Sequence, residues 1–315
     1  MRWFCRLCLP IGHSCSAGDM LLSSSIMLVA ATMLVLVVIF ALTFGHASPP
    51  AALRPPVPDL VKLQAGTFRH RAAGEFSREG KPVTAPIVTA AIKRTLAVMR
   101  HQVTAADYQR CVDAEVCPVV DRGGAVPNLP IVKVSWRDAR AYASWLSRET
   151  GEHFRLPTDE EWAYAAGSWF QDDALPETLD VGDPGRRALA IYDREASRQE
   201  RLDQAPHPVG SFGANENGLL DFAGNVWEWT DTCYARSAVD ARGGVTATMV
   251  NCGVRVVEGR HRTYIADFIR DARAGGCSIG TPPSNLGFRL VRDDDPRHAQ
   301  RPLSAWVRRL VGLQT

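Results

Sequence analysis

The stretch GLLDFAGNVWEWT, residues 218–230, gathers side chains that could bind a cation. Asp221, Asn225 and Glu228 carry oxygens, and Gly224 lets the backbone turn tightly and aim its carbonyls inward. Hard oxygens that converge on a turn suit Ca²⁺. A turn whose Asp and Asn side chains bond their own backbone explains the same residue types. The spacing alone leaves both interpretations open.

The same stretch also predicts a core anchor. Trp227 and Trp229 occupy alternate positions, so in an extended chain both rings point to the same side. Tryptophan rings bury large apolar areas. We therefore expect a strand here that packs into the centre of the domain.

Cysteine spacing predicts disulfides rather than a metal site. Of the eight cysteines, five follow an apolar segment near the N-terminus. Cys111 and Cys117 lie six residues apart at the end of a predicted helix, which favours a local disulfide in an oxidising compartment. We expect one further bond within the odd set Cys233, Cys252 and Cys277.

Capping patterns predict the elements that position these residues. Short helices should begin after Thr104, Ser135 and Thr158, each followed three residues later by Asp or Glu. Gly151 and Gly167 should end the second and third helices. The helical signals are brief, glycines are frequent, and no alternating βαβ pattern indicates a doubly wound sheet. We expect an α+β domain.

Composition excludes some functions. The chain has 315 residues, of which 46% are hydrophobic and 22% charged, as in ordinary globular proteins. The formal net charge is +2, and no zinc finger, RNA-binding aromatic motif or long basic run is present. We therefore expect no nucleic-acid partner.

The N-terminus predicts export. Residues 21–44 are uncharged and long enough to cross a bilayer as one helix, and Arg2 and Arg6 before them place residues 1–20 in the cytoplasm. Residues 45–58 are a proline-rich linker. A signal peptide cleaved after Ala47 is the alternative. In either case the domain lies outside the cytoplasm, on the periplasmic side of the inner membrane in a Gram-negative source.

Three motifs together resemble the formylglycine-generating enzyme family, the sulfatase-modifying factors. They are RLPTDEEWAYAAG at 155–167, GLLDFAGNVWEWT at 218–230 and SNLGFRLVR at 284–292, in the family's order. The resemblance covers residues 59–292 and implies an α+β domain of the C-type-lectin-like kind with little regular secondary structure. The tail, residues 293–315, predicts a short amphipathic helix. By resemblance, structural Ca²⁺ would bind the side chains of Asp221 and Glu228 and the carbonyls of Gly224 and Val226.

The chain departs from the family at the copper site. The family's enzymes oxidise a sulfatase cysteine with O₂ and Cu(I) held by two thiolates, soft ligands that select Cu(I). The matching segment, 253–276, has no cysteine, and the resemblance places Arg260 and Ile265, or their close neighbours, at the thiolate positions. Copper is therefore not expected.

The groove candidates that remain are Arg260, His261, Arg262 and Cys277. A basic cleft for an anionic or carboxylate-bearing ligand is one interpretation, and ion pairs with neighbouring Asp residues are the other. Two functions stay open. One is an oxidoreductase-like enzyme that matures an exported protein or peptide, and the other is a non-catalytic module that binds a peptide or polar ligand.

Overall fold

The computed structural model describes most of the chain from Pro55 to Asp294. The described residues are 55–120, 126–171, 183, 185–186, 189–190, 192–193, 197, 205–222, 224–274, 278–279 and 285–294. The predicted anchor at 21–44, Cys277 and the predicted helix of the tail lie outside them. No helix within the described ranges is long and apolar enough to cross a membrane.

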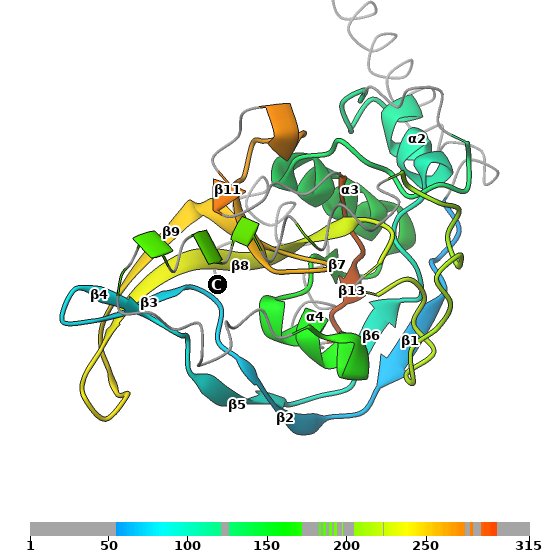
Figure 1. Ribbon diagram of the computed structural model, residues 1–315. Coiled ribbons are helices and arrows are strands. Elements are labelled where there is room, and N and C mark those ends of the chain that lie inside the picture. Colours follow the sequence, from blue (N-terminus) through cyan, green and yellow to red (C-terminus); the bar gives the residue numbers. More distant parts are fainter. Residues whose placement is uncertain are drawn as a thin grey trace, which may run out of the picture. The chain divides into compact units, whose positions relative to one another are not determined.

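A four-stranded sheet joins the beginning and the end of the domain (Figure 1). Its strands, in spatial order, are β1 (Leu60–Leu63), β6 (Leu96–Met99), β13 (Val291–Arg292) and β7 (Phe154–Arg155). All neighbours are antiparallel, with Val98 of β6 opposite both Val61 and Val291. The last motif of the sequence therefore closes the sheet beside the first strands.

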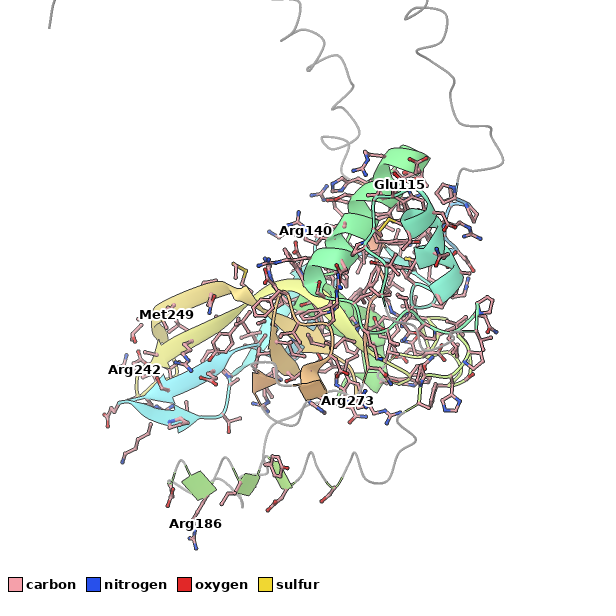
Figure 2. All side chains as sticks on the ribbon, turned by 90° about the horizontal axis from the view of Figure 1, so that it is seen from above. Glu115, Arg140, Arg186, Arg242, Met249 and Arg273 are labelled. Carbon is pink, nitrogen blue, oxygen red and sulfur yellow. A yellow bond between two sulfur atoms is a disulfide. The ribbon has the colours of Figure 1, made fainter. Side chains whose placement is uncertain are left out.

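A seven-stranded sheet carries the long ribbon of the domain. Its spatial order is β11 (Ser278–Ile279), β10 (Thr263–Ala266), β9 (Val245–Glu258), β8 (Trp227–Val239), β3 (Glu75–Arg78) and β4 (Lys81–Val83), with β12 (Leu286–Gly287) also paired to β8. β8 and β9 form an antiparallel ribbon whose far end bears Met249 and, in the connecting turn, Arg242 (Figure 2). A separate two-stranded sheet pairs β2 (Gly66–Arg71) with β5 (Ile87–Ile92).

Three α-helices begin at the predicted caps. They are α2 (Ala105–Asp113), α3 (Trp136–Thr150) and α4 (Asp159–Ala166), and short 3₁₀ turns follow at η2 (Gly167–Trp169) and η4 (Ala272–Ala274). Ser135 and Thr158 form complete capping boxes with Asp138 and Glu161. Thr104 accepts from the Asp107 amide as expected, but it donates its hydroxyl to the Asp107 carboxylate, so the reciprocal backbone bond is replaced.

The predicted helix ends are also confirmed. Gly151 follows α3 in the left-handed conformation with φ 77°, a conformation that glycine adopts without steric cost. Gly167 follows α4 with φ 56°, and a Cβ there would lie 2.2 Å from Glu216 Oε1. Sheet-rich architecture with few helices agrees with the expected α+β class.

Two hydrophobic clusters fill the domain. The larger packs α2 and α3 against β8 to β10, and the smaller packs α4 against β1 and β6. Trp227 and Trp229 are 2% and 0% exposed, which confirms the predicted anchor. Trp229 also donates its indole N–H to the carbonyl of Val134 at 2.8 Å, so it fixes β8 to the chain that enters α3.

Two disulfides lie in the described part of the domain. Cys111 at the end of α2 bonds Cys117, as predicted. Cys233 on β8 bonds Cys252 on β9, which selects one pair from the three candidate cysteines. The ribbon is thus covalently closed near its base.

Candidate functional site

The motif turn ties a neighbouring loop to the core. The buried Asp221, with φ 58°, accepts hydrogen bonds from the amides of Gly210 at 2.6 Å and Phe212 at 2.9 Å. Asn225 accepts from the amide of His207 at 2.8 Å and donates to its carbonyl at 2.9 Å. The Asp and Asn side chains therefore bond backbone, as the turn interpretation expects, but it is the backbone of the preceding loop.

Glu228 is surrounded by hydrogen-bond donors. Arg289 donates Nε to Oε2 at 2.6 Å and Nη2 to Oε1 at 2.7 Å. Trp162 Nε1 adds a bond of 2.9 Å to Oε2, and Gln102 Nε2 one of 2.8 Å to Oε1. The carboxylate is 1% exposed and the guanidinium 0% exposed. Burial of the charge is thus matched by a bidentate cation and two further donors.

These contacts do not fit a Ca²⁺ ion at the predicted ligands Asp221, Gly224, Val226 and Glu228. The oxygens of both carboxylates already accept N–H groups, and an ion beside Glu228 would face the positive charge of Arg289. Among the described residues, no group of three or more His, Cys, Asp and Glu side chains is placed to hold a metal. The calcium site stays a prediction of the resemblance.

The turn between β9 and β10 packs on Trp227. The rings of His261 and Trp227 meet edge to face at 5.4 Å, and the Arg260 guanidinium lies 5.9 Å from the centre of the Trp227 ring. A Cβ on Gly259 would lie 2.6 Å from Trp227 Cδ1, so only glycine lets the chain pass this close. His261 is 1% exposed, whereas Arg260 is partly exposed. The turn is therefore part of the core, with Arg260 at its edge.

Arg262 joins two buried carboxylates. Its Nε lies 2.6 Å from Glu258 Oε1, and its Nη2 lies 3.1 Å from Asp159 Oδ1. All three side chains are at most 3% exposed. His261 and Arg262 therefore do not line a solvent-open basic cleft, because the interior encloses both. This corrects the cleft interpretation for these two residues.

Burial sets the protonation of this cluster. It raises the pKa of the Glu258 carboxyl well above its ordinary value, and the Asp159 carboxylate adds to the rise while Arg262 opposes it. Burial also lowers the pKa of the His70 imidazole on β2, against the opposing charge of Asp159. The cluster holds two acids for one guanidinium, and Glu258 is the acid whose pKa burial raises.

The positions expected for copper thiolates carry no sulfur ligand. Ile265 lies inside β10, 0% exposed, between Arg255 of β9 and Ser278 of β11. Arg260 packs on Trp227 as described. The four cysteines of the described ranges form the two disulfides. Cys277 lies outside these ranges.

Arg255 marks a second chemical feature, at the base of the ribbon. Its guanidinium lies 3.8 Å from the centre of the Trp136 ring, and its Nη1 donates to the Asp231 carbonyl at 2.8 Å and to Cys233 Sγ at 3.3 Å. Arg140 is exposed on α3 (Figure 2), and its guanidinium lies 4.9 Å from the centre of the same ring. No spacing in the sequence links these residues, since helix packing and strand register bring them together.

Comparisons with known proteins agree with the three motifs. The family model described as sulfatase-modifying factor enzyme 1-like domain matches residues 45–294. A formylglycine-generating enzyme of Streptomyces coelicolor is 34% identical over 181 residues, which cover 54% of this chain and 54% of the relative. A Mus musculus protein named inactive C-alpha-formylglycine-generating enzyme 2 is 36% identical over 173 residues, or 52% of this chain and 49% of the relative. The chain spans about half the length of these relatives.

Solved structures include one of similar extent. PvdO from Pseudomonas aeruginosa aligns with a TM-score of 0.49 and 24% identity, covering 75% of this chain and 94% of that one.

Proposed function

Because the chain belongs to the sulfatase-modifying factor enzyme 1-like domain family, we propose that it is an exported protein that recognises a peptide or protein on this scaffold without making formylglycine by the copper route. The supporting observation is which residues stand where the copper-binding cysteines of the family are expected. Ile265 is sealed within a sheet and Arg260 packs on an indole ring, so neither position offers a sulfur to Cu(I). The relative named inactive C-alpha-formylglycine-generating enzyme 2 supports the proposal.

Export is supported by the cysteines and by the N-terminal sequence. Two disulfides are typical of an oxidising compartment. The apolar segment at 21–44 precedes them and is preceded by arginines. We therefore place the domain outside the cytoplasm, held by a single N-terminal anchor.

A maturation enzyme with a different chemistry is the second candidate. The observation that favours it is the partly exposed Cys233–Cys252 disulfide beside Arg255, because thiol chemistry on a partner needs an accessible sulfur.

Copper analysis and oxygen uptake test the proposal. The purified full chain is loaded with Cu(I) and given a peptide with the sulfatase motif Cys-x-Pro-x-Arg, with the Streptomyces coelicolor enzyme as the active control. We expect no stoichiometric copper, no oxygen uptake and an unchanged peptide mass. Stoichiometric copper with turnover would overturn the proposal.

A reporter tests export separately. Fused after Thr315, a reporter that folds only outside the cytoplasm should be active. Activity of a cytoplasm-only reporter at the same position would contradict the topology.

A further inference from the structure

The two disulfides of the domain lie in different surroundings. Cys111 and Cys117 are 0% and 6% exposed and belong to the main hydrophobic cluster. Cys233 is partly exposed, and Cys252 is exposed on the ribbon. Thiol–disulfide exchange needs in-line access to a sulfur. Only the second disulfide offers it.

A held cation distinguishes the two sulfurs of the exposed disulfide. Arg255 Nη1 lies 3.3 Å from Cys233 Sγ. The guanidinium is fixed by the Asp231 carbonyl and by the Trp136 ring, and only 11% of the side chain is exposed. A fixed cation stabilises a thiolate beside it. Cys233 is therefore the better leaving sulfur, and Cys252 is the accessible one.

A bulge places Cys252 where strand pairing is interrupted. Cys233 pairs with Arg255 and the next residue, Tyr234, with Asn251, so three β9 residues (252–254) have no register partner on β8. Bulges of this kind disrupt the ladder locally and often lie beside active sites. The Cys252 sulfur thus lies on a part of β9 whose backbone is not paired with β8.

The strand that leads to Cys252 has an open edge. From Val245 to Asn251, β9 pairs with β8 on one side, and within the described ranges the other side is covered only from Gly253 onward, by Asp267 and then by β10. This edge segment, VTATMVNC, carries no charge, and Met249 and Val250 are 63% and 60% exposed. Exposed edges without charges pair readily with an added strand. An extended, weakly charged peptide laid along it would end at Cys252.

We propose that Cys233–Cys252 is a thiol–disulfide exchange site for a cysteine carried on an extended segment of an exported protein. The partner's thiolate attacks Cys252 Sγ and forms a mixed disulfide with it. The Cys233–Cys252 bond breaks, and its electron pair leaves on Cys233 as a thiolate beside Arg255. One disulfide is consumed and one is formed, so the step needs no oxidant. It does not depend on the copper-free peptide recognition proposed above.

Exchange with reduced glutathione tests the site in the full chain. After acid quenching and alkylation, mass spectrometry reads glutathione and free thiol at each cysteine. We expect glutathione on Cys252 and alkylation of Cys233, with Cys111–Cys117 unreacted on the same timescale. Equal exchange of both disulfides, or glutathione on Cys233, would overturn the proposal.

A matched pair of variants tests the role of the cation. Arg255→Met keeps an apolar stem against Trp136 and should slow exchange about three- to tenfold. Loss of a neighbouring cation raises the pKa of a thiol by about one to two units, and a thiol of higher pKa leaves more slowly. Arg140→Met removes the other cation on Trp136 and should exchange like the wild type. Protection of Cys111–Cys117 reports that each variant is folded. An unchanged exchange rate in Arg255→Met would contradict a role of the Arg255 cation in the exchange step.

A second probe tests the strand edge. The peptide acetyl-Thr-Val-Cys-Thr-Val-amide and glutathione are compared on the wild type and on Val250→Lys, which places a charge beside the edge. The ratio of peptide rate to glutathione rate should fall in the variant. An unchanged ratio would contradict docking along β9.

Discussion

Arg289 and Glu228 form a bidentate ion pair that joins two distant sequence motifs inside the domain. The two N–O distances are 2.6 and 2.7 Å. Arg289 also donates to the carbonyl of Leu220 at 3.0 Å, just before the motif turn. Glu228 belongs to GNVWEW and Arg289 to NLGFR, so each motif supplies the charge that the other buries.

Removing Arg289 should be strongly destabilising. Arg289→Met leaves the Glu228 carboxylate buried without a cation, and we expect a loss of about 3–5 kcal/mol in the free energy of unfolding. Urea denaturation measures it. The control is Arg236→Met, an exposed arginine whose partner Glu75 is half-exposed, with an expected loss below about 1 kcal/mol. Similar small losses in both variants would contradict the structural role of the buried pair.

Chelation separates two accounts of Asp221 and Glu228. As both carboxylates accept N–H donors, we expect EDTA to leave the melting temperature unchanged. A ligand that binds only the folded state would instead raise it with concentration. A melting temperature that falls with EDTA, returns with Ca²⁺ and loses this response in Asp221→Ala would support the calcium site implied by the resemblance.

Features fixed by neighbouring residues could be predicted from the sequence. The starts of α2, α3 and α4 depend on caps within three residues, and the bond between Cys111 and Cys117 spans six. Alternation was enough to identify Trp227 and Trp229 as buried. Local rules of capping and periodicity determine such features directly.

Features fixed by register and packing could not be predicted. The sequence leaves Arg262 open between a basic cleft and an ion pair, because its partner Asp159 lies 103 positions earlier and only the fold brings the two together in the core. The contact of Arg255 with Trp136 likewise depends on how α3 packs on the ribbon. Residue type suggests that a charge needs a partner, whereas only the fold shows whether that partner is solvent or a buried acid.

The disulfide at the end of α2 should contribute modestly to stability. The double variant Cys111→Ala and Cys117→Ala opens a loop with a sequence separation of 6, for which chain entropy predicts a loss of about 2 kcal/mol. Thermal unfolding of oxidised wild type and variant measures it. A loss well above this value would show that core packing of the two sulfurs, rather than loop closure, dominates.

Glu258 should make the protein less stable as the pH rises. Burial raises the pKa of this carboxyl in the folded state above its ordinary value of 4.5, so the folded chain binds the proton more tightly than the unfolded chain does. Its contribution is fully present below about pH 4.5 and is lost as the pH rises toward the folded-state pKa. The slope for one proton is at most about 1.4 kcal/mol per pH unit.

Glu258→Gln isolates this effect, because the amide keeps the shape of the side chain and does not titrate. We expect the free energy of unfolding of the variant, measured in urea between pH 5 and 8, to lose the decline seen in the wild type. Glu75→Gln, at a half-exposed carboxyl on β3, should keep it. A decline that persists in Glu258→Gln would show that another group binds the proton. His70 cannot be that group. Burial lowers the pKa of its imidazole, so His70 resists charging in the folded state and its own contribution makes stability rise with pH.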